Sequence, residues 1–308
     1  MEQKRMKAVV YTEYGAPEVL RLTEMSIPVP KEREILVKIH AATVAAGDCR
    51  MRKPDPFAAR FYNGLFRPKR VNILGFECSG CVEAIGDAVD EFKPGDEVFA
   101  FTGFGFGAYA QYICLPVENR NIANGFVTFK PATVSHAEAA AVPCGGLTAL
   151  GFLNKAGIRN GQKILVYGAS GSVGTYAVQL AGFFGAEVTG VCSTANLELV
   201  ASLGAQRVVD YTTNDLAGMR KSFDIVFDAV GKLSPVDGKS LARKNGVYLS
   251  VNGSSEPMIE DLDFLRKLIE AGILKAVIDR RYPLEQIVEA HQYVDRGHKR
   301  GNVVITVC

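Results

Sequence analysis

Three glycines spaced three residues apart, Gly168, Gly171 and Gly174, constrain the fold of this chain more than any other feature of its sequence. They follow a segment with an apolar core, residues 163–167, and open a segment whose apolar residues recur at the spacing of one helix face. Glycine permits positive φ and close backbone approach, and the new helix offers free N–H groups and a positive dipole end. A strand, a glycine turn and a helix in this order predict a pyrophosphate-binding loop; the alternative is a glycine turn without a ligand.

The second half of the chain alternates apolar strands with helices, which predicts a parallel sheet covered on both faces. The predicted strands are residues 163–167, 187–192, 207–211, 223–228 and 246–251, and the predicted helices are residues 173–184, 196–203 and 235–242.

The first ~125 residues instead consist of short strands separated by glycine and proline, which predicts an all-β, barrel-like segment. Its strands are expected at residues 7–11, 34–42, 80–85, 96–101 and 108–115, and helices are expected at residues 135–141 and 146–153. The C-terminal part is expected to add a helix around residues 262–269, a strand at 274–279, a helix at 284–294 and a strand at 302–307.

Composition excludes several classes of protein. The 308 residues are 48% hydrophobic and 22% charged, which are globular proportions, and the net charge of +2 is spread along the chain. No basic stripe or aromatic platform indicates nucleic-acid binding. The first ten residues carry charges and no long apolar run, so neither a secretory signal nor a membrane span is expected. Seven scattered cysteines fit reduced thiols in the cytoplasm better than a disulfide framework.

Several motifs carry a resemblance to a known family. Gly161-Gln162, Ala169-Ser170-Gly171-Ser172, Gly174 and Gln179 resemble the signature of the zinc-independent quinone oxidoreductase (zeta-crystallin-like) branch of the medium-chain dehydrogenase/reductase superfamily, with departures at Ser172 and Gly182. The resemblance covers nearly the whole chain. It also rests on Gly75-x-Glu77-x-x-Gly80, Lys93-Pro94-Gly95-Asp96, Lys130-Pro131, Gly146-x-Thr148-Ala149 and residues 297–304.

The resemblance implies an α/β protein with a GroES-like β-barrel domain and a Rossmann-type doubly wound parallel sheet domain. The catalytic, GroES-like domain is expected at residues 1–125 with a C-terminal return at 273–308, and the NAD(P)-binding domain at residues 126–272. The active cleft is then expected near the carboxyl ends of the sheet strands.

The cofactor is expected to be NADPH, with NADH as the alternative. An NAD site usually has an acidic residue after the second strand, whereas this chain has Ser193 and Thr194, which would not repel a 2′-phosphate. No cation follows before Arg207, and Tyr211 either adds a hydroxyl or packs on a helix. The expected cofactor-binding residues are Thr148, Gly168, Ala169, Ser170, Gly171, Ser172, Val173, Gly174, Ser193, Thr194, Tyr211, Ala229, Val230, Gly231 and Asn252.

No metal is expected. Ala45 and Phe76 stand where zinc-bearing relatives have a cysteine and a histidine, and Cys144, in the place of a third ligand, cannot hold zinc alone. Cys78 and Cys81 are expected on opposite faces of one strand, so they do not form a redox or metal pair. The histidines at 40, 136 and 291 are interpreted as structural, and His298 as a surface residue.

Without zinc, the acceptor must be polarised by hydrogen bonds and must itself take the hydride, which suits a quinone or an α,β-unsaturated carbonyl compound. The resemblance implies a substrate pocket at Ala45, Asp48, Arg50 and Phe76. The proton comes from solvent or a tyrosine. Tyr62 is a weak candidate and is otherwise a core or rim tyrosine, so no catalytic residue is assigned.

Two other functions remain open. One is an NAD(P)-dependent alcohol or aldehyde dehydrogenase, against which the missing zinc ligands argue. The other is a non-catalytic dinucleotide-binding sensor, because a fold does not fix a function. The segment at 251–259 is shorter than in relatives, so either the sheet lacks its sixth strand or the sequence omits a stretch. Relatives often dimerise through that edge, which makes a homodimer one expectation.

Overall fold

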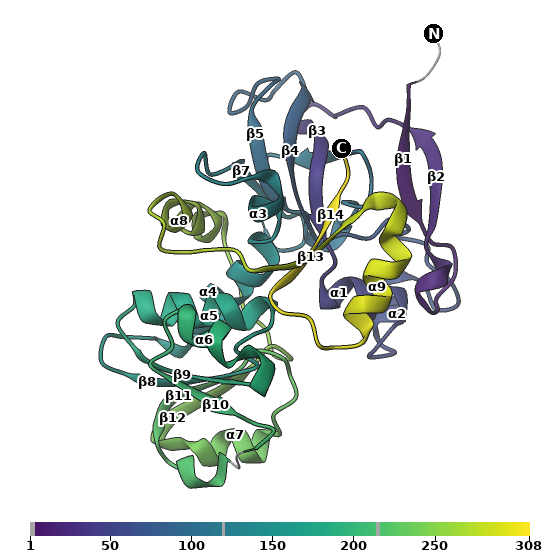
Figure 1. Ribbon diagram of the computed structural model, residues 1–308. Coiled ribbons are helices and arrows are strands. Elements are labelled where there is room, and N and C mark those ends of the chain that lie inside the picture. The colour runs from purple at the N-terminus through teal and green to yellow at the C-terminus, as the bar shows by residue number, and fades with distance from the viewer. Residues whose placement is uncertain (1–3, 119–120, 214–215) are drawn as a thin grey trace. The chain divides into compact units, whose positions relative to one another are not determined.

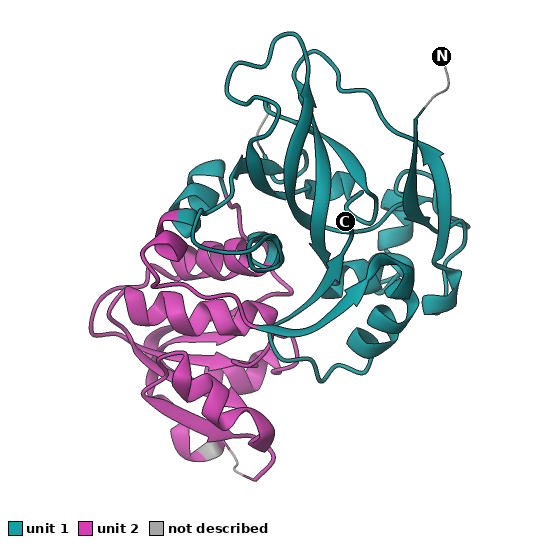
Figure 2. Cartoon of the chain, turned by 45° about the horizontal axis from the view of Figure 1, so that its top comes forward, with its two compact units in different colours: residues 1–144, 258–266, 278–308 teal, residues 145–257, 267–277 magenta. Residues whose placement is uncertain are grey.

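The computed structural model describes residues 4–118, 121–213 and 216–308. The chain divides into two compact units, shown in different colours in Figure 2. Unit 1 comprises residues 1–144, 258–266 and 278–308, and unit 2 comprises residues 145–257 and 267–277. Segments from both ends of the chain therefore belong to unit 1.

Unit 1 is built mainly of strands (Figure 1). A seven-stranded sheet has the order β13-β14-β3-β4-β5-β7, with β6 also pairing with β3, and β1 and β2 form a separate two-stranded sheet. Its pairs are antiparallel except for β13 with β14. The strands are β1 (Arg5–Val10), β2 (Arg21–Ser26), β3 (Glu34–Thr43), β4 (Glu77–Ile85), β5 (Glu97–Phe101), β6 (Tyr112–Pro116), β7 (Phe126–Phe129), β13 (Ile278–Pro283) and β14 (Asn302–Thr306).

Strand β3 is the centre of unit 1, because it pairs with β4, β6 and β14. Its alternating residues Ile35, Val37 and Ile39 are fully buried in one apolar core that also takes residues from α9 and β14. The helices of this unit are α1 (Ala46–Arg52), α2 (Ala59–Asn63), α3 (His136–Ala140) and α9 (Ile287–Asp295). Two further helices, α4 (Pro143–Ala156) and α8 (Ile259–Glu270), run across the division between the units.

Unit 2 contains a five-stranded, all-parallel sheet of order β10-β9-β8-β11-β12. Helix α5 contacts β8 and β9, while α7 contacts β11 and β12, and Figure 1 shows α5 above the sheet and α7 below it. Both faces are thus covered, as a doubly wound sheet requires. The elements are β8 (Lys163–Tyr167), α5 (Ser172–Phe183), β9 (Glu187–Cys192), α6 (Leu197–Ser202), β10 (Arg207–Asp210), β11 (Phe223–Asp228), α7 (Pro235–Leu241) and β12 (Ala242–Ser250).

The α/β fold class expected from the sequence, a GroES-like barrel plus a Rossmann-type sheet, is confirmed. The predicted strands 163–167, 187–192 and 223–228 agree with β8, β9 and β11 residue for residue. These strands are buried on both faces, so each appears in the sequence as an apolar run bounded by turn residues.

The strand predicted at residues 274–279 is wrong for most of its length, since β13 begins only at Ile278 and runs to Pro283. This edge strand pairs only with β14 and carries Arg280 and Arg281 exposed, so it lacks an apolar alternation. The short elements β2, β7, α1 and α2 were not expected either. Residues 251–258 form a turn and an irregular segment, so β12 is the edge of the five-stranded sheet in the described part of the chain.

Across the described ranges, we find no helix that combines the length and the apolar character needed to cross a bilayer.

Candidate nucleotide-binding and substrate sites

The glycine-rich loop lies between β8 and α5, at the carboxyl edge of the parallel sheet. The backbone N–H groups of Gly168 and Ala169 both donate to the carbonyl of Val191 at 3.0 Å, which fastens the loop to the neighbouring strand β9. Gly168 has φ of +76°, a conformation that favours glycine. The loop is therefore fixed before the helix starts, and the first N–H groups of α5 point out of the helix end.

Two of the glycines are required for different reasons. A Cβ at Gly174 would lie 2.1 Å from the carbonyl oxygen of Gly168, so the close packing of α5 on the loop leaves no room for a side chain. At Gly171 the nearest protein atom to such a Cβ is 3.4 Å away, and φ is −79°. Neither packing nor backbone strain thus requires glycine at 171. A Cβ there would make only ordinary van der Waals contacts with Gly168 and Val230, so the absence of a side chain is explained by a pyrophosphate that must approach the backbone closely.

The loop after β11 lies against the glycine-rich loop. The side chain of Val230 is the nearest group to a Cβ built at Gly168, at 2.5 Å. The Asp228 carboxylate accepts hydrogen bonds from the N–H groups of Gly231 at 2.8 Å and Leu233 at 3.0 Å, which shapes this loop. Asn252, after β12, donates to the carbonyl of Gly231 at 3.1 Å. The structure thus brings Val230, Gly231 and Asn252 together beside the pyrophosphate loop.

The ends of β9 and β10 bring together Ser193, Thr194 and Tyr211, because Cys192 and Asp210 pair in register. The Thr194 hydroxyl donates to the Asp210 carboxylate at 2.5 Å, and Thr212 also donates to that carboxylate. These hydrogen bonds lower the pKa of Asp210, with Thr194 as the largest cause. Sequence reasoning missed Asp210, an acid that ends the third strand, β10, rather than following the second. Tyr211 is exposed and its ring lies 6.2 Å from that of Tyr167.

Thr148 lies in α4, one turn after Gly145. A Cβ at Gly145 would lie 2.8 Å from the Ser172 hydroxyl and 2.9 Å from the Tyr176 ring, so this face of α4 packs on the start of α5. The residues expected at the cofactor therefore follow all five strands of the sheet in turn, with Thr148 on the adjoining helix.

In unit 1, Asp48 is fully buried and acts as a brace. Its two carboxylate oxygens accept from the N–H groups of Ala45 and Gly75, both at 2.8 Å. Burial raises the pKa of Asp48 to about 7, and the two backbone hydrogen bonds oppose that shift. The side chain holds the start of α1 against the segment before β4, and its neighbour Arg50 is exposed.

Phe76 is half-buried and packs among apolar groups. Its ring lies 4.0 Å from the Phe106 ring and 6.0 Å from the Phe101 ring, and a Cβ at Gly47 would lie 2.3 Å from it. Where zinc-bearing relatives were expected to place a histidine, this chain has an aromatic ring in an apolar cluster. Ala45, at the other expected ligand position, precedes α1 and offers no ligand atom.

A buried polar group beside these residues was not expected from the sequence. Glu77 accepts from the N–H of Cys144 at 2.6 Å and from the Thr43 hydroxyl. Burial raises the pKa of Glu77 to about 7, while the Lys299 ammonium opposes the shift. Burial in turn lowers the pKa of Lys299, which donates to the carbonyl of Gly301 at 2.6 Å. Glu77 had appeared only as part of a motif, and nothing in the sequence connected it to Lys299.

Tyr62, the weak candidate for a proton donor, has its hydroxyl engaged. It donates to the carbonyl of Phe104 at 2.7 Å, and Arg70 lies over its ring at 4.3 Å. These contacts hold the segment around α2 and provide a role for Tyr62 that requires no substrate.

One group of side chains in the described part of unit 1 can hold a metal ion. Ligand atoms of His40, Cys81 and His136 all lie within 4.8 Å of one another. None of these residues is among those expected at the cofactor or the substrate.

Comparison with known proteins gives three family matches. Residues 31–123 match the model described as an alcohol dehydrogenase GroES-like domain. Residues 172–271 and residues 254–305 match two models described as zinc-binding dehydrogenase.

Relatives match the chain over nearly its whole length. A 2-methylene-furan-3-one reductase of Solanum lycopersicum is 34% identical over 97% of this chain and 79% of its own. An NADPH-dependent alkenal/one oxidoreductase of Arabidopsis thaliana is 32% identical over 98% of this chain and 80% of its own. The solved structure of the quinone oxidoreductase from Coxiella burnetii has a TM-score of 0.85 at 28% identity and covers 99% of this chain and 100% of that one.

Proposed function

Because the chain belongs to the medium-chain dehydrogenase/reductase superfamily, in its zeta-crystallin-like quinone oxidoreductase branch, we propose that it is an NADPH-dependent enzyme that reduces quinones or α,β-unsaturated carbonyl compounds without zinc. The observation that carries this proposal is the pair of local features described above: a backbone cradle at Gly171 and an aromatic ring at the position of a zinc ligand.

The nucleotide fits the residues present. The N–H groups at the start of α5 and the bare backbone at Gly171 provide for a pyrophosphate, and Val230, Gly231 and Asn252 flank it. When bound, the nicotinamide supplies a hydride to the acceptor. The role of the chain is to hold the nucleotide by backbone groups, whose positions the contact of Gly168 with Val191 fixes in advance.

The class of acceptor depends on whether the protein can polarise the carbonyl group of the acceptor with a metal ion. Ala45 and Phe76 cannot hold a Lewis-acid metal at the place expected from relatives, so a simple aldehyde or ketone would lack activation there. A quinone or enone delocalises the incoming negative charge within its own conjugated system. Ala45, Arg50 and Phe76 are the proposed pocket residues, with Asp48 and Glu77 as buried braces beneath them.

Solvent is the proposed source of the proton. Tyr62 is the weaker candidate, since its hydroxyl already donates to the carbonyl of Phe104. Glu77 accepts a hydrogen bond from the N–H of Cys144 at the start of α4. We therefore assign Glu77 as a positioning residue.

We assign NADPH as the preferred nucleotide and NADH as the weaker one. The neutral Ser193 after β9, where an NAD site usually has an acid, supports this preference, as does the NADPH-dependent relative. Asp210 works against it, because its carboxylate lies close to Thr194 and would repel a 2′-phosphate.

An alcohol dehydrogenase is the second candidate. A solved structure described as an NAD-dependent alcohol dehydrogenase has a TM-score of 0.84 at 28% identity and covers 98% of this chain. A dinucleotide-binding sensor without turnover is the third candidate, and it would bind the nucleotide through the same glycine-rich loop.

One experiment separates the three candidates. Nucleotide consumption is measured with a panel of quinones, enones, aldehydes and alcohols, with NADPH and with NADH, before and after treatment with a chelator. The proposal predicts oxidation of NADPH by quinones or enones at a rate that the chelator leaves unchanged. Chelator-sensitive alcohol oxidation would establish the second candidate, and binding without consumption the third.

Three further assignments complete the proposal. Catalysis is assigned to the domain of residues 1–125 with 273–308 and nucleotide binding to that of residues 126–272, although residues 126–144 and 258–266 of the latter are part of compact unit 1. The protein acts in the cytoplasm on a small molecule and needs neither nucleic acid nor membrane. It forms a homodimer through the exposed edge at β12, which light scattering of the purified protein would test.

A further inference from the structure

A cluster in unit 1 combines three side chains that bind transition metals. His40, Cys81 and His136 are each half-buried, and one ligand atom of each lies within 4.8 Å of the other two. They come from β3, β4 and α3, and the first and last are 96 positions apart in the sequence (136 minus 40). The cluster shares no residue with the nucleotide loop or with the proposed substrate pocket.

Two local features of the fold, a β-bulge and a helix N-terminus, direct these side chains toward one another. His40 lies at an irregularity of β3, where Ile39 pairs with Gly80 but Ala41 pairs with Ser79, and such a bulge redirects a side chain. His136 opens α3, a helix that packs on β3, β4 and β5 and is capped by a reciprocal Ser135–Glu138 pair. The rings of His40 and His136 stack with centroids 4.5 Å apart.

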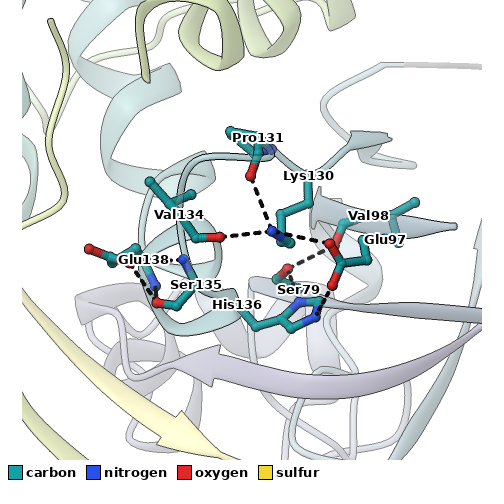
Figure 3. A network of polar contacts seen from close by, with 9 residues as sticks. All are labelled: Ser79, Glu97, Val98, Lys130, Pro131, Val134, Ser135, His136 and Glu138. Atoms are coloured by element: carbon teal, nitrogen blue, oxygen red, sulfur yellow. Dashed lines mark hydrogen bonds and ion pairs between the residues drawn. The ribbon is translucent and has the colours of Figure 1, made fainter. Parts of the chain in front are cut away.

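The hydrogen bonds of His136 select its metal-binding nitrogen. Its Nδ1 lies 2.8 Å from the Ser79 hydroxyl, which itself donates to the carbonyl of Val98 at 2.8 Å (Figure 3). A hydroxyl carries a single hydrogen, so Ser79 must accept from Nδ1–H. Nε2 is then the nitrogen with an available lone pair. A histidine ligand held through its other nitrogen is the usual arrangement at protein metal sites.

An acidic group lies next to that nitrogen. Glu97 Oε1 is 3.1 Å from His136 Nε2, and Glu97 is the cross-strand neighbour of Cys81 in the β4–β5 pair. The other oxygen of Glu97 lies 3.3 Å from the Lys130 ammonium, which orients the carboxylate (Figure 3). Two lone pairs so close together repel unless a proton or a metal ion lies between them.

We propose that His40, Cys81 and His136 bind one Zn²⁺ ion, and that the Glu97 carboxylate, which already lies 3.1 Å from His136 Nε2, turns toward the ion to become the fourth ligand. One thiolate, two imidazole nitrogens and a carboxylate oxygen form a ligand set that suits tetrahedral zinc. Binding forms a Zn–S bond and releases the Cys81 thiol proton to solvent. With four protein ligands the site is closed, so it links β3, β4, β5 and α3 and takes no part in hydride transfer.

The test is a Co²⁺ titration of the full, chelator-treated chain followed by absorption, because tetrahedral Co²⁺ bound to a thiolate gives a sulfur-to-metal charge-transfer band. The wild type is expected to show that band, to saturate at one Co²⁺ per chain and to lose the band when Zn²⁺ is added. Cys81→Ser is expected to abolish the band and to weaken Zn²⁺ binding more than ~100-fold, beyond the ~10–100-fold that outer-shell changes cost.

Matched controls separate the cluster from the other thiols and imidazoles. Cys114→Ser, which removes a half-buried thiol on β6, and His298→Ala, which removes an exposed imidazole, are expected to leave the spectrum unchanged. X-ray absorption at the zinc edge of the wild type, which needs no variant, is expected to show one sulfur at ~2.3 Å and nitrogen or oxygen at ~2.0 Å.

Each of the following outcomes would overturn the proposal: no charge-transfer band in the wild type, a band that persists in Cys81→Ser, or a zinc-edge absorption spectrum that shows no sulfur ligand. Binding of copper but not zinc would also overturn it, since the ligand set would then belong to another metal. The test reads the metal itself, so it is independent of the activity proposed above.

Discussion

The two units build their candidate sites in opposite ways. In unit 2 the site is made of backbone: residues 168–174 are a short loop and the first residues of α5, and the other groups follow successive strands of one parallel sheet. In unit 1 it is made of side chains from distant parts of the chain, as when Glu77 accepts from Thr43 and from Cys144. A backbone site is damaged by an added Cβ, whereas a side-chain site is damaged by a change of chemistry. The predictions below use this difference.

The largest loss of stability is expected in unit 2, from the addition of a single methyl group. Gly174→Ala places a Cβ 2.1 Å from the carbonyl of Gly168, so either α5 or the loop must shift. We expect a loss of more than ~3 kcal/mol in the free energy of unfolding, measured by denaturant titration. Gly182→Ala is the control in the same helix, where nothing lies within 4 Å, and is expected to gain up to ~1 kcal/mol. Equal stability of the two variants would contradict the packing of α5 on the loop.

The next effect concerns a side chain of unit 1 and depends on pH. Burial raises the pKa of Glu77 from 4.5 to about 7, so between these values the folded protein binds more protons than the unfolded chain. Its stability therefore falls as pH rises through this window, by up to ~1 kcal/mol per pH unit. Glu77→Gln is expected to flatten this fall, as measured by urea unfolding at several pH values.

The matched control for Glu77 is Glu83→Gln, on the same strand but exposed. It is expected to keep the wild-type slope. Asp48, whose pKa is also raised to about 7 by burial, remains in both variants. Part of the loss of stability with rising pH is therefore expected in both of them. Identical slopes in Glu77→Gln and the wild type would show that Glu77 is ionised throughout the window.

The smallest effect concerns a side chain of unit 2 that bears on the choice between NADPH and NADH. Asp210→Asn removes a negative charge beside Thr194, so a 2′-phosphate would be repelled less. We expect the ratio of kcat/KM for NADPH over NADH to rise by ~3–10-fold. Glu187→Gln, at the opposite end of β9, is expected to leave the ratio unchanged. A ratio that does not move in Asp210→Asn would remove this carboxylate from the nucleotide site.

The same contrast explains what the sequence predicted. Strands β8, β9 and β11 and the loop at residues 168–174 depend on neighbours in the chain, so apolar runs and glycine spacing were enough to find them. Strands β2 and β13 are largely exposed edges with polar residues, and each is held by pairing with one partner strand.

The groups in unit 1 escaped prediction for a related reason. The motif containing Glu77 was visible, but its hydrogen bonds with Thr43 and Cys144 and its electrostatic interaction with Lys299 depend on how distant segments pack. Likewise, Cys81 was judged by its spacing from Cys78, whereas the histidines that approach it come from another strand and a helix. A single sequence carries no signal for such pairs of residues.

The most direct test of the account is calorimetric titration of the intact protein with NADPH, for the wild type and for Gly171→Val. Its Cβ meets no protein atom closer than 3.4 Å and φ is −79°, so the variant is expected to fold with a melting temperature lowered only by the loss of a favourable N-cap residue. The account predicts that NADPH binds the wild type and binds Gly171→Val at least ~100-fold more weakly, because the valine occupies the space of the pyrophosphate. Equal affinity in the two proteins, or no binding to the wild type, would contradict it.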